Sequence, residues 1–392
     1  MSAPARTTIC REGFYYLLVL GLVFGGAMIR EVNLLLVLAG LLLGPLLFNW
    51  RAVAVTLRGL SVRRKVPESV CAGDLLVASV TVSNSRRRLS SWTLVVEDEI
   101  WPEGESTREK PLRPGVLLLH VPPGETRKAD YRGRLVRRGR YRLGPLRVST
   151  RFPFGLLCRT MIVDQQATLT VLPRLGRLKQ PSARRRQEAF AGTHRRERRH
   201  GVEGDFYGLR PWHSGDSRRW IHWRSSARRG TLLVRQFEQP RNREVLVLLD
   251  LWQPPRPSAR QLDNVELAVS FAATVLTDLC RKGGATLHLA LSDPQPRCLS
   301  GPASALLLDE MMHALAVVEA GSDDRLPELL AAALSQVDPG SEAIVVSTRS
   351  VDPNDAVRFG AFVNDPARRG LARQVRCVDT SDAKLSEVFE LD

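Results

Sequence analysis

Five side chains of the kinds found in catalytic or metal sites lie close together in the middle of the chain: His213, Asp216, His222, Ser225 and Ser226. His and Asp act as general bases or metal ligands, and Ser is a nucleophile when a base activates it. Their neighbours point to other roles. Asp216 is placed to cap a helix, and His222 is expected among arginines, whose charges would repel a metal ion. We therefore expect no catalytic residue, metal or cofactor here.

The element expected to position these residues is a helix that begins at Ser217 and stops at Gly230. Asp216 is its expected N-cap, and glycine suits its C-terminal end. At about 100° per residue, Trp220, Trp223 and Ala227 share one face. The opposite face carries Arg218, His222, Ser225 and Arg229. We predict that the indoles point inward and the cations outward, as in an amphipathic helix.

Residues 204–238 contain three linked motifs. They read Gly-Asp-Phe-x-Gly-Leu-Arg-x-Trp, Gly-Asp-x-x-Arg-x-Ile-x-Trp and Ser-Ala-Arg-x-Gly-x-Leu-x-Val-x-x-Phe-Glu. This segment resembles the signature of the domain of unknown function 58 family, and the layout of nearly the whole chain is similar to that family. The resemblance implies a membrane-anchored protein without established catalytic activity that cooperates with a MoxR-type AAA+ ATPase.

The signature residues that we expect to form an interaction surface are Arg210, Asp216, Arg218, Arg219, Trp223, Arg228 and Arg229.

Two uncharged, mostly apolar runs, residues 13–29 and 32–50, open the chain. Each is long enough to cross a bilayer, which takes about 17 to 25 residues, so residues 1–50 are predicted to form a transmembrane helical hairpin. A cleaved signal peptide is the alternative, and the second apolar run disfavours it. Arg and Lys flank the outer ends of both runs. The positive-inside rule then predicts a multi-pass cell-membrane protein whose termini and soluble domains are cytoplasmic.

Short alternating segments follow the hairpin, at residues 76–82, 93–97 and 116–121. This period predicts an all-β sandwich domain over residues 51–173. Residues 174–203 are rich in Arg and His with few apolar positions, so we expect a basic linker, which is either solvated or held on anionic lipid.

Residues 241–392 alternate apolar strands (244–250, 285–291 and 343–347) with helices (265–280, 305–320, 326–337 and 355–364). Such alternation predicts a doubly wound α/β domain, which looks like a von Willebrand factor A-type domain. Related domains often hold Mg²⁺ through an Asp-x-Ser-x-Ser loop. Here Trp252 and Pro254 follow Asp250 at the hydroxyl positions, so the site is predicted to be degenerate and without metal.

The net charge of +16 is uneven, with +11 over residues 51–173, +12 over 174–244 and −8 over 245–392. A uniformly basic coat is thereby excluded. The six cysteines stand far apart, which argues against a zinc ribbon or a disulfide framework and favours a reducing compartment.

Three functions remain at this point. A non-catalytic, membrane-anchored interaction or adaptor protein is favoured, acting in the assembly or maturation of an envelope complex. Nucleic-acid binding, suggested by Arg beside Trp, is disfavoured because the indoles are expected to face inward and the C-terminal domain is acidic. An unrecognised hydrolase that uses His213, Asp216 or His222 is the third.

Overall fold

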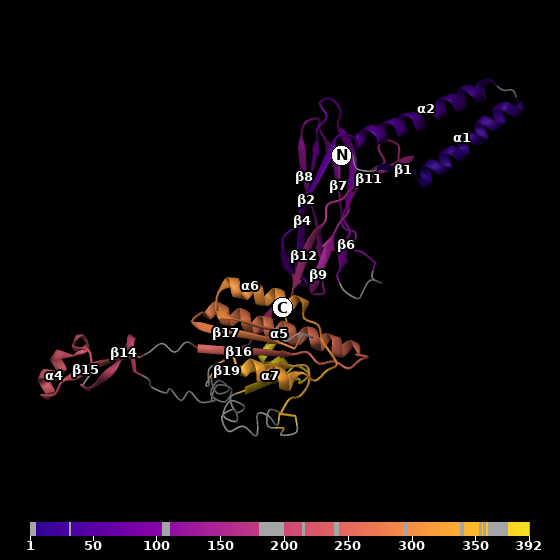
Figure 1. The fold of residues 1–392 in the computed structure, drawn as a ribbon. Coiled ribbons are helices and arrows are strands. Elements are labelled where there is room, and N and C mark those ends of the chain that lie inside the picture. The colour runs from indigo at the N-terminus through magenta and orange to yellow at the C-terminus, as the bar shows by residue number, and fades with distance from the viewer. Residues whose placement is uncertain are drawn as a thin grey trace. The chain divides into compact units, whose positions relative to one another are not determined.

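The computed structural model describes residues 5–30, 33–103, 110–179, 200–213, 216–238, 243–292, 297–337, 341–352, 355, 358–359 and 375–391. The chain divides into two compact units, Met1–Arg174 with His313–Val317, and Leu175–Met312 with Val318–Asp392. The first unit contains two apolar helices and a β-rich body, and the chain as a whole is mixed α/β (Figure 1).

The two apolar helices are α1 (Arg11–Arg30) and α2 (Asn33–Thr56). Both are long and apolar enough to cross a membrane, and more than half of their side chains are exposed. The hydroxyl of Tyr16 on α1 donates to the Leu42 carbonyl of α2 at 2.6 Å. The helical hairpin was predicted to end at Trp50, but α2 continues six residues further, to Thr56. Residues 51–56 contain no Gly or Pro that would end the helix.

The first unit also contains a β body built from three sheets. The strand orders are β1-β11-β10-β5-β7, β3-β12-β9-β6 and β2-β4-β8. The three alternating segments predicted from the sequence are confirmed as β4, β5 and β7. One strand of this body lies outside the range predicted for the β domain: β1 precedes the helices and pairs antiparallel with β11. The strands span Ala5–Ile9 (β1), Leu60–Lys65 (β2), Ser69–Cys71 (β3), Leu75–Asn84 (β4), Ser91–Glu97 (β5), Ile100–Pro102 (β6), Gly115–Val121 (β7), Thr126–Arg134 (β8), Gly139–Leu143 (β9), Leu146–Thr150 (β10), Leu157–Val163 (β11) and Ala167–Leu172 (β12).

The β body has two apolar cores, because alternate residues of each strand face the same side. Val80, Val82, Leu94 and Val148 belong to the larger core. A buried ion pair lies beside it, in which one Nη of Arg64 is 2.7 Å from both carboxylate oxygens of Asp98.

The second unit contains a five-stranded sheet of order β18-β17-β16-β19-β20. Four of these strands are parallel and the edge strand β18 is antiparallel to β17. Helices α5 and α7 lie on opposite faces of the sheet (Figure 1), and Leu246 and Leu248 of β16 pack against α7. The elements are β16 (Arg243–Asp250), α5 (Ala259–Lys282), β17 (Ala285–Leu291), β18 (Arg297–Pro302), α6 (Ala305–Val317), α7 (Leu326–Leu334), β19 (Glu342–Ser347), β20 (Val375–Asp379), α10 (Leu385–Val388) and, pairing with β13 (Gly176–Leu178), β21 (Phe389–Leu391).

The predicted basic linker is shorter than its expected range, because β13 lies inside residues 174–203 and the next strand starts at His200. Its arginine run at residues 184–186 lies outside the described residues, as does most of the helix predicted over residues 355–364. All six cysteines lie in the described part of the chain and none forms a disulfide.

Candidate functional site

The signature segment folds as an antiparallel hairpin of β14 (His200–Pro211) and β15 (Leu233–Glu238), with a connection that holds the 3₁₀ turn η1 (Arg218–Trp220) and helix α4 (Trp223–Arg229). The connection folds back on the hairpin, since Ile221 bridges to Val234 and the His222 amide donates to the Leu233 carbonyl at 2.8 Å. Gly230 ends α4 in the left-handed conformation at φ 69°, as predicted.

The continuous helix predicted from Ser217 is wrong, and so is the role given to Asp216. Ile221 is extended, with ψ 126°, so the chain breaks between η1 and α4. His222 is the N-cap of α4, where its Nδ1 accepts from the Ser225 amide at 3.3 Å. Pairing of Ile221 with Val234 outweighs the local helical pattern, and Asp216 is left without a helix to cap.

Asp216 instead closes the loop that follows β14. Its two carboxylate oxygens accept from the two Nη atoms of Arg210, each at 2.6 Å, and one of them also accepts from the His213 amide at 2.8 Å. Hydrogen bonds from the Arg210 guanidinium and then from the His213 amide lower the pKa of Asp216 to about 2. This paired geometry gives both strength and direction to the contact. The carboxylate is therefore ionised at neutral pH and committed to the arginine.

The break also changes which face of α4 is buried. Trp223 is 65% exposed, so its predicted place in the core is wrong, whereas Ile221 and Ser226 are buried with Leu233 and Val234. A helical projection that runs through residue 221 gives the wrong phase, since each residue of extended chain shifts the side-chain direction by about 180° instead of 100°.

Two of the side chains considered for catalysis, His213 and Ser226, make structural contacts. Arg210 has no acceptor atom, so Nδ1 of His213 accepts from it at 3.0 Å. The buried Ser226 hydroxyl donates to the His222 carbonyl at 3.0 Å and accepts from the Leu233 amide at 2.9 Å. These contacts make a fold-stabilising role the simplest account of both side chains.

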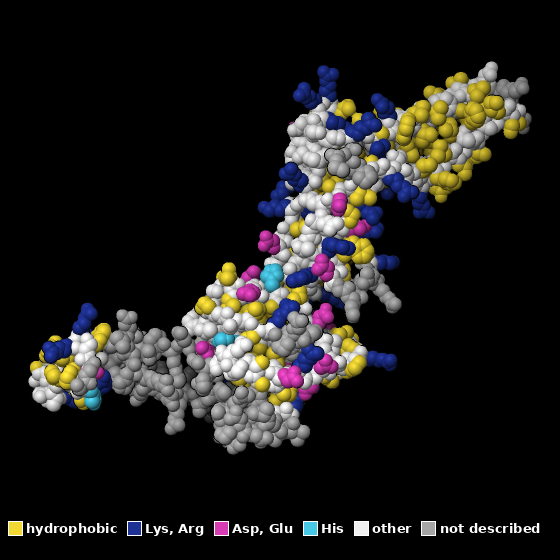
Figure 2. All heavy atoms as spheres, in the orientation of Figure 1, with side chains coloured by type: hydrophobic (Ala, Val, Ile, Leu, Met, Phe, Trp, Pro, Cys, Tyr) yellow, Lys and Arg dark blue, Asp and Glu magenta, His cyan; other side chains and the backbone are white. Residues whose placement is uncertain are grey.

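An exposed surface remains on η1 and α4. We call it the Trp223 surface, and it comprises Arg218, Arg219, Trp223, Arg224, Arg228 and Arg229. All six side chains are exposed, and no described carboxylate lies within ion-pair distance of these five arginines. Figure 2 shows cationic side chains beside apolar ones on the hairpin that carries α4. Arg224 was not among the predicted interaction residues. Its position beside Trp223 was the available signal.

A second cluster lies at the carboxyl ends of β16 and β19, where the strand order reverses. Ligand sites of open α/β sheets occur at such switch points. The Ser347 hydroxyl donates to Asp250 Oδ2 at 2.9 Å, and Arg349 Nε lies 3.5 Å from the same oxygen. Burial raises the pKa of Asp250, against the lowering effects of the Ser347 hydrogen bond and the Arg349 charge.

The rest of this cluster consists of charge pairs. Asp324 accepts from Arg349 at 2.6 Å and from two nitrogens of Arg358 at 2.7 and 2.8 Å, and Arg358 is the main cause of its lowered pKa. The Arg349 guanidinium lies 5.0 Å from the centre of the Trp252 ring. The cation beside Asp250 is thus a side chain of the protein. Within the described ranges no three His, Cys, Asp or Glu side chains form a metal-sized group.

Arg349, Asp324 and Arg358 were missed by the sequence analysis. Ser347 could have been found, because it ends a predicted apolar strand and lies opposite Asp250 in the parallel register. The structure brings Arg210 and Asp216 together and places Arg218, Arg219, Trp223, Arg228 and Arg229 on one short connection. Asp250 belongs to the second cluster.

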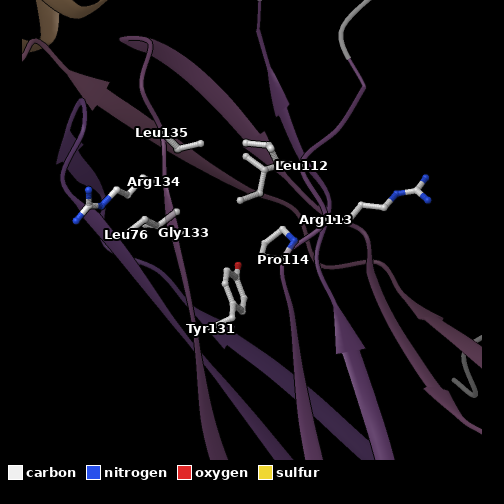
Figure 3. Close-up of a pocket in the computed structure, with 9 residues that line it drawn as sticks. Leu76, Leu112, Arg113, Pro114, Tyr131, Gly133, Arg134 and Leu135 are labelled. Carbon is white, nitrogen blue, oxygen red and sulfur yellow. The ribbon is translucent and has the colours of Figure 1, made fainter.

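A hollow of about 240 Å³ in the β body is a further candidate. Figure 3 shows the Arg113 and Arg134 side chains directed away from it, which leaves a wall that is mostly apolar. The Tyr131 hydroxyl already donates to Asp98, and burial is the main cause of the raised pKa of this tyrosine. The described lining therefore offers few polar side chains with which to orient a substrate.

Comparisons with known proteins agree with the signature over part of the chain. A curated protein of Bacillus subtilis (strain 168), "Uncharacterized protein YeaD", is 26% identical over 215 residues, which cover 54% of this chain and 50% of that protein. The chain thus spans about half the length of this relative.

Two solved structures have low similarity. The CARDB domain of the PF1109 protein of Pyrococcus furiosus is 17% identical, with coverage of 29% of this chain and 91% of that one and a TM-score of 0.20. A β-glucosidase of Listeria innocua is 12% identical, with coverage of 29% and 16% and a TM-score of 0.21. TM-scores this low support no inference about fold or function.

The range matched by a family model is narrower than the predicted resemblance. It begins within β14 and ends after α7, so it leaves out the apolar helices and the β body. Residues 208–340 match the family described as "Protein of unknown function DUF58".

Proposed function

We propose that this chain is a membrane-anchored, non-catalytic interaction protein in which α1 and α2 span the bilayer and the Trp223 surface binds a protein partner. The helices support anchoring, because apolar side chains such as Leu22, Ile29, Leu34 and Leu41 are at least 68% exposed on them. Exposed apolar surface of this extent is costly in water and favourable in lipid.

The observation that carries the docking role is the exposure of Trp223 among five exposed arginines. Trp and Arg are the residue types most enriched at the energetic centres of protein interfaces. The backbone beneath them is held by the Arg210–Asp216 pair and by the Ser226 hydrogen bonds, so little backbone entropy would be lost on binding.

For the partner we propose a MoxR-type AAA+ ATPase, on the strength of the family resemblance. The cationic Trp223 surface suits an acidic patch on such a partner. Arginines flank the outer ends of the apolar helices, which supports a cytoplasmic side for both termini and for the soluble parts.

The von Willebrand factor A-like description of the α/β sheet also belongs to this proposal. Counted within the domain, the strand order is 3-2-1-4-5, as in doubly wound folds that bind ligands at the switch point. Because Arg349 supplies a cation beside Asp250, we propose that the Asp250 cluster works without a metal ion. Trp252 lies two residues after Asp250, and its Nε1 donates to the Ser322 carbonyl at 2.8 Å. An indole has no oxygen with which to bind a cation.

The test uses the detergent-solubilised full chain and a purified MoxR-type ATPase from the same organism. Trp223→Ala and, separately, Arg228→Glu are each expected to weaken binding at least tenfold. Arg256→Glu is the matched control, since it reverses an exposed arginine outside the Trp223 surface. Equal binding by all four proteins would refute a docking role for this surface.

Nucleic-acid binding is the second candidate, and the exposure of Trp223 favours it. The predicted inward position of the indoles argued against this function, and for Trp223 that reason no longer holds. An exposed indole among arginines is also the composition of single-strand binding surfaces. A salt-sensitive affinity for single-stranded DNA or RNA that Trp223→Ala abolishes would replace the protein partner with this one.

A further inference from the structure

The turn at residues 151–155, between β10 and β11, lies against the ends of both apolar helices. The Leu156 carbonyl accepts from the Cys10 amide at 3.0 Å, just before α1 begins. The Leu157 amide donates to Oδ1 of Asn49, on α2, at 2.9 Å. Both groups of one peptide unit are therefore bound by the helix ends, which fixes the turn relative to the hairpin.

The packing around this peptide is close. A Cβ added at Gly13 of α1 would lie 2.0 Å from the Leu156 carbonyl oxygen, so no larger residue fits there. Val53 of α2 packs with Leu156 and Leu157 in a small apolar core. The helices and the β10–β11 turn thus form one packed junction.

The turn directs an aromatic side chain toward the apolar part of α2. The Gly155 amide donates to the Arg151 carbonyl at 2.8 Å, and Gly155 has φ 75°, which favours glycine and lets the chain reverse directly after Phe154. Phe154 is 53% exposed, and its ring centre is 6.1 Å from that of Phe48, which is 60% exposed. Phe154 therefore adds an apolar side chain at the level of Phe48.

Aromatic and cationic side chains lie together near Phe48, where α1 begins and α2 approaches its C-terminal end. Phe14, Tyr15 and Trp50 are each at least 58% exposed at the same ends of the two helices. Exposed arginines lie beside them at positions 11, 51 and 151, and Glu12 is the neighbouring exposed acid. Figure 2 shows Lys and Arg side chains around the base of the yellow helices. Aromatic belts with flanking cations are typical of membrane–water interfaces.

We infer that the turn at residues 151–155 is a membrane-contacting element, in which Phe154 enters the interface beside Phe48 and Arg151 binds anionic lipid headgroups. This inference rests on the proposed membrane span of α1 and α2. It adds a contact made by the β body itself, about one hundred residues away in sequence from the helices. Such a contact fixes how far the β body stands from the bilayer, since the peptide after the turn is bound by both helix ends.

The test places the photoreactive residue benzoylphenylalanine at single positions of the full chain in nanodiscs of phosphatidylcholine and phosphatidylglycerol in equal amounts. Position 154 is the turn, where the substituted side chain keeps the aromatic ring of phenylalanine. Position 41, in the middle of α2, reports whether the helix spans. Position 136 is the matched control, because Val136 is an apolar side chain that is 79% exposed just after Arg134. Arg134 ends β8, about 25 to 30 Å along the strand from Thr126, which lies near the end of α2.

Lipid adducts at positions 41 and 154, with none at 136, are the expected result. An adduct at 41 without one at 154, or equal adducts at 154 and 136, would overturn the inference and leave membrane anchoring intact. No adduct at 41 would refute the proposed span itself. In the chain labelled at 154, Arg151→Gln is expected to lower the ratio of anionic to zwitterionic adducts about fivefold, whereas Arg151→Lys retains it. An unchanged ratio in Arg151→Gln would overturn the role given to that arginine.

Discussion

Two arginine–aspartate pairs in this chain use the same chemistry in different surroundings. Arg64 and Asp98 of the β body are 34 residues apart, and their side chains are 1% and 0% exposed. Arg210 and Asp216 of the signature hairpin are six residues apart, with side chains 25% and 17% exposed. The first pair joins β2 to the connection between β5 and β6 in the interior of the β body, and the second closes a local loop. The difference teaches that burial decides whether such a pair stabilises a whole domain or shapes one surface.

The buried pair is also tied into more of its surroundings. Arg64 Nη2 donates to the Gln165 carbonyl at 2.8 Å, the Tyr131 hydroxyl donates to Asp98, and the Glu99 amide donates to Asp98 at 2.9 Å. Removal of Asp98 would take the acceptor from the Tyr131 hydroxyl and the Glu99 amide, and removal of Arg64 would take a donor from the Gln165 carbonyl. In the hairpin, water can replace the lost contacts, because both side chains reach solvent.

The largest effect is therefore expected from Asp98→Ala, which leaves the Arg64 charge buried without a partner. We expect a loss of about 3 to 5 kcal/mol in the free energy of unfolding of the β body. Hydrogen exchange of the β4 and β8 peptides measures it locally in the full chain. The double change Arg64→Leu with Asp98→Leu removes both charges and should cost less than Asp98→Ala. A double variant less stable than the single one would contradict the assigned cause.

Ser226→Ala should have the next largest effect, of about 1 to 3 kcal/mol, because the buried Leu233 amide loses its acceptor. The expected readout is faster hydrogen exchange in α4 and β15, with the β body unchanged. Ser225→Ala is the matched control, since the Ser225 hydroxyl makes none of the hydrogen bonds that hold this connection. Similar exchange in both variants would show that the Ser226 hydroxyl is dispensable.

The comparison also shows which features could be predicted. Strands β4, β5 and β7, and the alternation of strands and helices after residue 243, follow from local periodicity, which the sequence displays directly. The choice of which face of α4 is buried does not follow from local periodicity. It is set by the pairing of Ile221 with Val234, thirteen residues away. No pattern within residues 217–229 reports that pairing.

One half of the Arg64–Asp98 pair is visible in the alternation of residues along β2. Val62 and Arg64 are both buried and occupy alternate positions of β2, so they share its inner face. An arginine on the inner face of a strand requires a carboxylate partner. The identity of that partner could not be predicted, because Asp98 is brought to it by the sheet packing and not by sequence spacing.

A smaller effect is expected from acid on the hairpin pair. The pKa of Asp216 is lowered to about 2 from an ordinary value near 4. A lowered carboxyl pKa contributes stability that is complete above the unfolded-state value and is lost as pH falls through the folded-state value. The loop should therefore hold from neutral pH down to about 4 and open between about 4 and 2.

Pepsin cleavage near Trp212, followed in the full chain at several acidic pH values, measures this opening. Cleavage should accelerate steeply between about pH 4 and 2 in the unaltered protein. Asp216→Asn has no charge to titrate, so its loop should already be cleaved readily at pH 4. Equal cleavage of both proteins at pH 4 would mean that the ion pair does not hold the loop.

The smallest effect on stability is expected from Trp223→Ala. The continuous helix predicted from the sequence would have buried Trp220 and Trp223 on one face, and the structure does not bury Trp223. Because Trp223 is 65% exposed, its removal should change the free energy of unfolding by less than about 1 kcal/mol. Trp220 is only partly exposed, so Trp220→Ala should cost more, and the two variants form a matched pair on one connection. Hydrogen exchange of β15 distinguishes them. If Trp223→Ala destabilises the hairpin as much as Trp220→Ala does, Trp223 serves the fold and the Trp223 surface loses its proposed centre. If instead only partner binding falls, by roughly thirtyfold for a loss of about 2 kcal/mol, the indole acts at an interface, where an exposed tryptophan contributes most.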